Sequence, residues 1–218
     1  LAATGSRRRL ARDDGRDRDA RARGRWTHAR PLLLDARGQG GLLDVAVAPD
    51  FAQSRRVWFS YAEPREGGKN GTAVATGTLS ADGSSLEGTE VIWQQQPAWD
   101  STKHYGSVLI HDGQGGLFVT TGERSVPDAR VYSQNVTTTL GKVVRIDPET
   151  GAPMGDPGVA EALPEIWSWG HRNIQSAALD RQGRLWTVEH GARGGERGDG
   201  SADEVEPGVR DAGIKAAA

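Results

Sequence analysis

The segment Asp112-Gly-Gln-Gly-Gly-Leu-Phe118 decides the fold, because the chain repeats it as Asp180-Arg-Gln-Gly-Arg-Leu-Trp186. In each copy an Asp-x-x-Gly turn separates two β-runs, and the second run opens with a leucine and an aromatic residue. Such a pattern is typical of a β-hairpin. Residues 49–58 form a degenerate third copy. Hairpins that recur roughly every sixty residues favour the blades of a β-propeller, because each hairpin must bury its faces against a neighbour.

Short apolar runs bounded by aspartate and glycine turns continue from about residue 38 to residue 192, and they predict an all-β fold. No amphipathic helix of about ten or more residues is expected, and residues 125–140 are expected to hold a single helical turn. The strands that we predict are 42–48, 56–62, 72–79, 88–94, 106–112, 116–121, 141–147, 175–180 and 184–189.

The composition argues against several classes of function. The chain has no cysteine, so it has no disulfide, zinc–thiolate site or cysteine nucleophile. A net charge of −2 gives no reason to expect a nucleic-acid or anionic-membrane partner. No run of about 18 apolar residues is present, so we expect no membrane-spanning helix. No signal peptide is visible after Leu1.

The two ends of the chain differ in pattern from its middle. Residues 1–36 are rich in arginine that alternates with aspartate, alanine and glycine, and residues 197–218 lack strand patterning. We expect both segments to be disordered or translated out of frame. Residues 37–196 then form the folded region.

The hairpin repeat also gathers polar residues at one end of the predicted blades. The second strands run into Tyr61-Ala-Glu63, Thr121-Gly-Glu-Arg124 and Glu189-His-Gly191. In equivalent blades these ends lie on one face and converge near the axis. Loops at one end of a rigid β scaffold are where sites usually form.

His104 and Arg172 are the candidate catalytic residues. His104 follows Lys103, whose like charge favours a neutral imidazole that can act as a general base. The alternative for His104 is an exposed loop histidine. Arg172-Asn173 offers a planar fork of donors and an amide, which can stabilise an oxyanion or carboxylate. The alternative is a turn held by bonds from side chain to backbone.

Two glycine-rich segments are candidates for ligand binding. Gln39 lies in a glycine-rich turn ahead of a strand, where its amide could meet a ligand or only tie the turn. The segment His190-Gly-Ala-Arg-Gly-Gly195 could direct backbone carbonyls at a hard cation, or could be a mobile loop.

Eight motifs, in order along roughly residues 37–196, resemble the soluble aldose sugar dehydrogenases that use pyrroloquinoline quinone (PQQ), the glucose/sorbosone dehydrogenase family. They are Gly38-Gln-Gly-Gly-Leu-Leu-Asp-Val-Ala46, Pro49-Asp-Phe51, Phe59-Ser-Tyr-Ala62, Lys103-His-Tyr-Gly-Ser107, Thr120-Thr-Gly-Glu-Arg124, Leu140-Gly-Lys-Val-Val-Arg145, Gly170-His-Arg-Asn173 and Glu189-His-Gly191.

This resemblance implies a six-bladed β-propeller of antiparallel blades that oxidises the C1 hydroxyl of an aldose to the lactone, with hydride transfer to PQQ. His104 would be the base, and Arg172 would stabilise charge on the quinone oxygen. Gln39, Asn173 and His190 would contact the cofactor or the substrate. The carbonyls of the two residues that follow His190, Gly191 and Ala192, would hold a Ca²⁺ that polarises the quinone.

The resemblance further implies an aldose substrate, a separate electron acceptor and a periplasmic or secreted location. The family's first strands and last blades have no recognisable counterpart, so we expect an incomplete propeller from a partial or frame-disrupted member with impaired activity. The alternative function is a non-catalytic propeller module that binds carbohydrate or protein. A calcium-dependent propeller lactonase is disfavoured, because acidic residues are not clustered.

Overall fold

The computed structural model describes residues 32–190 and the backbone of residues 214–217, and these form three antiparallel sheets. The first sheet contains β1 (Leu42–Val47), β2 (Arg56–Pro64), β3 (Asn70–Leu79) and β4 (Leu86–Gln94) in that order. The second contains β5 (Gly106–His111), β6 (Leu117–Thr121), β7 (Lys142–Ile146) and β8 (Ile166–Trp169). The third has the order β11 (Ile214–Ala217), β10 (Leu185–Glu189) and β9 (Ile174–Leu179).

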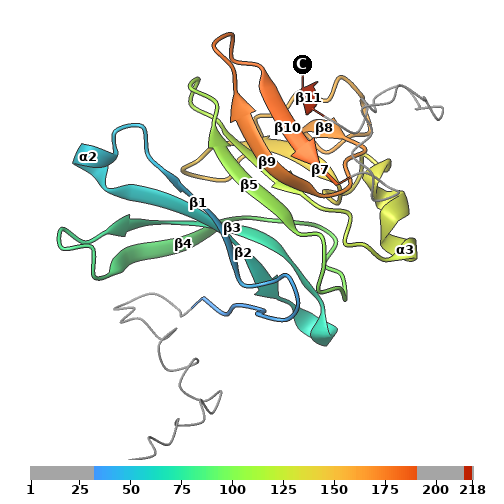
Figure 1. The fold of residues 1–218 in the computed structure, drawn as a ribbon, viewed down its shortest axis with the longest axis horizontal. Helices are drawn as coiled ribbons and strands as arrows, with labels where there is room; N and C mark the ends of the chain where they lie inside the picture. The colour runs from blue at the N-terminus through green and yellow to red at the C-terminus, as the bar shows by residue number, and fades with distance from the viewer. Residues whose placement is uncertain (1–31, 191–213, 218) are drawn as a thin grey trace, which may run out of the picture.

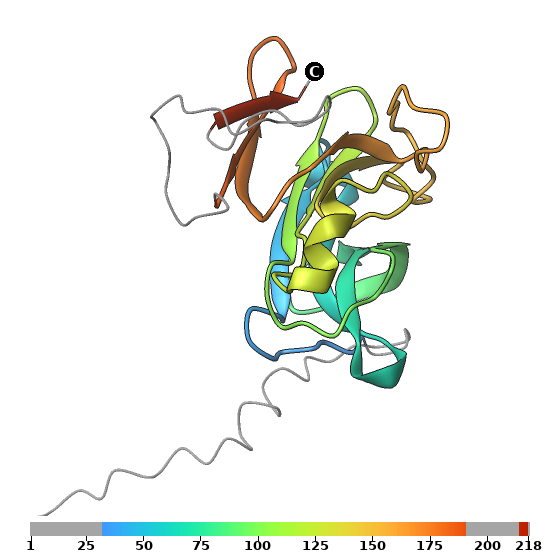
Figure 2. The same ribbon diagram turned by 90° about the vertical axis from the view of Figure 1, so that its right-hand side faces the viewer.

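Each sheet is a meander that begins with an inner strand, and the three inner strands lie side by side. Figure 1 shows β1, β5 and β9 next to one another, with contacts between β1 and β5 and between β5 and β9. Figure 2 shows the sheets in succession, from the first (blue to green) to the third (orange). The sheets are therefore successive blades of an incomplete β-propeller, and the predicted all-β fold is confirmed.

All nine predicted strands are present, and each boundary lies within two residues of its prediction. Two strands were not predicted. The four-residue β8 pairs with β7, and β11 pairs with the free edge of β10. Both are too short to show an alternating pattern, so their strand form follows from the edges that they pair with.

The repeated turn also has the expected structure. Asp112 accepts hydrogen bonds at Oδ1 from the amides of Gln114 and Gly116, at 2.6 and 2.8 Å. Asp180 does the same for Gln182 and Arg184, each at 2.9 Å. In the degenerate copy the turn between β1 and β2 is replaced by α2 (Phe51–Ser54).

Helical structure in the described part of the chain is confined to short turns. Besides α2 they are η1 (Glu66–Gly68), α3 (Pro127–Arg130) and η2 (Val131–Ser133). The last two follow one another directly and lie where a single helical turn was predicted, within residues 125–140, so the helical segment is longer than the prediction. None of the helices in this part of the chain is long and apolar enough to cross a membrane.

Two of the three hydrophobic core clusters lie between blades, and the third lies on the first sheet alone. One cluster joins Trp58, Val74 and Trp93 of the first blade to Leu117 and Val144 of the second. Another cluster joins Phe118 and Val143 of the second blade to Ile174 and Leu185 of the third. Because a sheet buries a face only against its neighbour, this packing holds the loops at the blade ends in register.

Candidate active site

The candidate site is built from loops that lead into the three inner strands at the same end of the blades. Gln39 precedes β1, His104 precedes β5, and Arg172 and Asn173 precede β9. In an antiparallel hairpin the start of one strand lies beside the end of the next. The ends of β2, β6 and β10 therefore surround these loops, as the repeat predicted.

His104 is held from two sides. Its backbone N–H donates to Oε1 of Gln39 at 2.8 Å, and its ring Nδ1 lies 2.6 Å from Oε2 of Glu123. An ionised carboxylate only accepts hydrogen bonds, so Nδ1 carries the hydrogen and Nε2 is the acceptor nitrogen of the neutral ring. The His104 side chain is 11% exposed, which rules out the alternative of an exposed loop histidine.

The backbone at His104 is unusual, and Gly122 makes it possible. His104 has a φ of 50°, a left-handed conformation that non-glycine residues rarely adopt. A Cβ on Gly122 would lie 2.0 Å from the carbonyl oxygen of His104. Only glycine at position 122 allows the two loops to approach this closely, which places Glu123 beside the imidazole.

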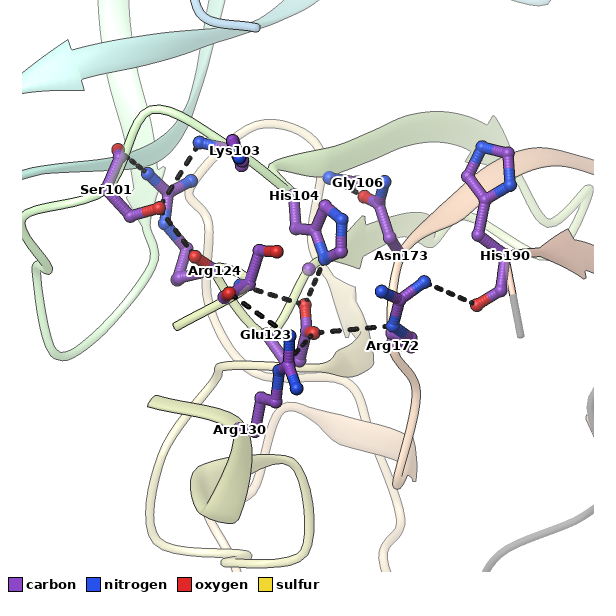
Figure 3. Close-up of polar contacts among 12 residues, drawn as sticks. Ser101, Lys103, His104, Gly106, Glu123, Arg124, Arg130, Arg172, Asn173 and His190 are labelled. Carbon is purple, nitrogen blue, oxygen red and sulfur yellow. Dashed lines mark hydrogen bonds and ion pairs between the residues drawn. The ribbon is translucent and has the colours of Figure 1, made fainter. Parts of the chain in front are cut away.

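Glu123 is the centre of the polar cluster. Its side chain is 3% exposed, and its Oε1 lies 3.7 Å from Nε of both Arg130 and Arg172. Figure 3 shows His104, Arg130 and Arg172 converging on this carboxylate from three different segments, of which the one with Arg130 is the helix α3. His104 and Arg172, 68 positions apart in sequence, therefore share one contact partner.

The Arg172 loop is fixed by the end of β10. The backbone N–H of Arg172 donates to Oε2 of Glu189 at 2.8 Å, and the Nη1 of Arg172 donates to the carbonyl of His190 at 3.4 Å. The His190 amide donates to the carbonyl of Asn173 at 3.3 Å, and Oδ1 of Asn173 accepts the Gly106 amide at 3.1 Å. This last bond joins the Arg172 loop to the start of β5.

A cavity of about 650 Å³ lies beside these loops, between the inner strands. Its volume falls within the range of about 300–1,000 Å³ that is usual for small-molecule sites. Gln39 and Asn173 line it, together with polar side chains of β1, β5 and β9 that include Asp44, Ser107 and Gln175. His104 and Arg172 are not part of the lining, and their side chains are 11% and 26% exposed.

The structure brings together Gln39, His104, Arg172, Asn173 and His190, all of which the sequence singled out. Gly191 and Ala192, the predicted calcium ligands, lie outside the described residues. Within residues 32–190, no group of three or more histidine, aspartate or glutamate side chains is placed to hold a metal ion.

Three residues of the cluster had no role in the sequence interpretation. They are Glu123, Arg130 and Glu189. The signal for the two glutamates was present, because each of the second strands of the hairpin copies has a glutamate at or near its end, namely Glu63, Glu123 and Glu189. The signal for Arg130 was absent, because its place depends on how α3 packs against the site.

Comparison with other proteins places the chain in a family. The sequence profile of the family described as "Glucose / Sorbosone dehydrogenase" matches residues 17–207. The chain is 44% identical over 164 residues to the aldose sugar dehydrogenase YliI of Escherichia coli (strain K12), covering 74% of this chain and 43% of that protein.

Solved structures are also similar to the fold, among them two aldose sugar dehydrogenases. The soluble aldose sugar dehydrogenase of Escherichia coli in its apo form has a TM-score of 0.68 and 42% identity, over 73% of this chain and 46% of that chain. The PQQ-bound aldose sugar dehydrogenase of Streptomyces coelicolor has a TM-score of 0.62 and 26% identity, over 74% of this chain and 45% of that chain. The chain thus spans less than half the length of these three relatives. The chain belongs to the glucose/sorbosone dehydrogenase family.

Proposed function

We propose that the chain is part of a PQQ-dependent oxidoreductase that oxidises the C1 hydroxyl of aldose sugars to the lactone. The observation that carries this proposal is the cluster in which His104 and Arg172 both contact the buried carboxylate of Glu123. When bound, PQQ would supply the hydride acceptor, and Ca²⁺ a Lewis acid beside it, because protein side chains provide no hydride acceptor of their own.

The described residues fit a ligand of that kind. PQQ is a polar, anionic quinone, and the cluster offers it two partly exposed guanidinium groups, those of Arg130 and Arg172. The adjacent cavity provides amide groups from Gln39 and Asn173. A site that combines cations and amides around a cavity of this size suits an anionic, hydrogen-bonding ligand.

His104 is the base in this proposal. Because Nδ1 donates to Glu123, the lone pair of Nε2 is available to take the proton of the sugar hydroxyl. The carboxylate holds the ring in one orientation and stabilises the positive charge that the ring gains on accepting the proton. This is the arrangement that general-base catalysis requires, namely a base oriented by a third group.

Arg172 supplies positive charge at the same place. Its backbone is fixed by Glu189, and its guanidinium contacts Glu123 and the carbonyl of His190, so the group is oriented before any ligand arrives. In the proposal Gln39, Asn173 and His190 contact the cofactor or the substrate, and the carbonyls of Gly191 and Ala192 hold the Ca²⁺. Alanine at position 192 keeps the backbone oxygen that such a ligand needs. Export to the periplasm, which family membership suggests, is a further part of the proposal.

The test is dye-linked oxidation of aldoses by the protein after reconstitution with PQQ and Ca²⁺. His104→Gln should lower kcat by about a hundredfold or more, because a general base contributes at least that factor. His111→Gln is the matched control. It changes a partly buried histidine at the other end of β5 and should leave kcat near the unmodified value.

Two results would count against the proposal. Retention of kcat in His104→Gln would remove the base from the mechanism. Binding of sugars without oxidation, and without any change in visible absorbance on adding PQQ, would instead support a non-catalytic module that binds carbohydrate.

A further inference from the structure

Arg124 is buried directly beneath the loop that carries His104. The residue is 0% exposed, and its Nη2 donates to the carbonyl of Ser101 at 2.5 Å and to Oδ1 of Asn70. In return, the hydroxyl of Ser101 donates to the carbonyl of Arg124 at 2.5 Å. The guanidinium carbon lies 3.7 Å from the centre of the Tyr105 ring. Arg124 therefore contacts both ends of the segment from residue 101 to residue 105.

Burying a guanidinium group costs desolvation free energy, so the contacts that Arg124 makes indicate its role. Desolvation lowers the pKa of Arg124, and among the described residues no carboxylate bonds to it directly. Asn70, which accepts from Arg124, in turn donates from its Nδ2 to Oδ2 of Asp35 at 2.7 Å. An arginine needed only to fill space would be better replaced by an apolar side chain. The polar contacts of the guanidinium all concern the His104 loop and its support.

Backbone strain is concentrated in the same two segments. Five non-glycine residues in the described chain have positive φ, and four of them are His104, Ser107, Arg124 and Ser125. Strained backbone persists only where the surrounding structure holds it, and it clusters at functional sites. Arg124 (φ 70°) contacts Ser101 and Tyr105, which lie on either side of His104 (φ 50°) in the sequence, so each segment restrains the other.

We propose that Arg124 is a positioning residue for His104, in which its guanidinium fixes the backbone from Ser101 to Tyr105 while the neighbouring Glu123 orients the ring. The two consecutive residues thus divide the task between them. The catalytic importance of this arrangement rests on the proposed function, in which His104 is the base. The positional claim can be measured without any substrate or cofactor.

The experiment compares Arg124→Met with the unmodified protein by NMR. Two reporters are read: hydrogen exchange of the His104 and Gly106 amides, which donate to Gln39 and Asn173, and the proton signal of the His104 Nδ1–H, which donates to Glu123. We expect exchange of the two amides to rise about tenfold or more, because charge-assisted hydrogen bonds that order the loop are lost. The Nδ1 proton signal should broaden or disappear.

Arg145→Met is the matched control. Arg145 is also mostly buried, donates to Asp112 and to the carbonyl of Met154, and lies at the opposite end of the second blade. Its loss should lower the melting temperature while both reporters at His104 stay unchanged. If Arg124→Met also leaves both reporters unchanged, or if Arg145→Met disturbs them equally, the positioning role is wrong.

Arg124→Lys keeps the test decisive if Arg124→Met does not fold. Lysine retains the charge, but its side chain is shorter than that of arginine, so it cannot reach Ser101 and Asn70 as Nη2 of Arg124 does, and it has no planar guanidinium to stack on Tyr105. We expect amide exchange between that of the unmodified protein and that of a disordered loop. Exchange equal to that of the unmodified protein would show that the guanidinium is not needed, and would overturn the proposal.

Kinetics of the reconstituted protein then separate the two proposals. Arg124→Lys should lower kcat by about tenfold and change KM less, because it displaces the base and leaves the cavity intact. If the unmodified protein oxidises no aldose, the proposed function fails. The exchange data still decide whether Arg124 positions His104.

Discussion

At the scale of single residues, the chemistry of the site is set by contacts between segments and not by sequence neighbours. The sequence argument for His104 relied on Lys103, the residue before it. In the structure the partner of the ring is Glu123, 19 positions later, and Gly122 is what allows the approach. The same holds for Arg172, whose backbone is fixed by Glu189.

Asp35 makes a residue-scale prediction about pH. The Arg37 guanidinium, with help from Asn70, holds the pKa of the Asp35 carboxyl well below its usual range, although burial opposes this. The folded state therefore binds a proton less readily than the unfolded chain. Stability that is present above the unfolded pKa of about 4 is lost as the pH falls towards the folded pKa.

Urea unfolding of the unmodified protein and of Asp35→Asn measures this effect. The free energy of unfolding of the unmodified protein should fall more steeply between about pH 5 and about pH 3 than that of the variant. Asp50→Asn, at an exposed aspartate, should keep the steep slope. If the free energy of unfolding falls with pH equally in the unmodified protein and in Asp35→Asn, the Asp35 carboxyl does not contribute to the pH dependence of stability.

At the scale of elements, one buried lysine holds the segment that contains α3 and η2. Lys142 opens β7 and is 0% exposed. Its Nζ donates to the carbonyls of Tyr132, Ser133 and Leu140 at 2.8, 2.9 and 2.6 Å. The segment carries Arg130 to the candidate site, so β7 positions the site through this ammonium group (Figure 3 shows Arg130 beside Glu123).

Lys142→Met should therefore destabilise the protein by about 2–4 kcal/mol, because three carbonyls lose their hydrogen-bond donor in a buried place. The free energy of unfolding in urea is the measurement. Lys69→Met, at an exposed lysine beside η1, should change it by less than about 0.5 kcal/mol. A similar small change in Lys142→Met would mean that the segment holds its position without the ammonium.

At the scale of the whole molecule, side chains join blades whose inner strands share no backbone ladder. Oδ2 of Asp44 in β1 accepts the amide of Leu109 in β5 at 2.8 Å, and the Ser60 hydroxyl donates to the carbonyl of Ser107 at 2.7 Å. Apolar contacts between the same blades form the largest core cluster. Hydrogen bonds are directional, so these bonds fix the relative position of the two blades, which apolar contacts alone do not specify.

Asp44→Ala tests this connection between the first two blades. It leaves the Leu109 amide without its acceptor, so hydrogen exchange of that amide should rise and the free energy of unfolding should fall by about 1–3 kcal/mol. Asp82→Ala is the control, because the bonds of that aspartate stay within its own turn. Exchange at Leu109 that does not change would contradict the role given to Asp44.

The fold was predictable from local pattern to a large extent. Nine strands follow from alternation and from Asp-x-x-Gly turns, because both depend on residues adjacent in sequence. The strand Ile166–Trp169 escaped prediction because four residues carry too little pattern. The candidate site was predictable only in part, since the conspicuous residues could be named but their partners could not.

The sequence by itself determined the hairpins, the end of the blades at which the polar residues lie, and the identity of His104, Arg172 and Gln39 as candidates. Only the tertiary structure decided that Glu123 joins His104 to Arg172 and that Arg124 lies beneath the His104 loop. The physical reason is that a turn is stabilised within a few residues. A buried carboxylate or guanidinium, by contrast, acquires its partners from whichever loops the packing of neighbouring blades brings to it.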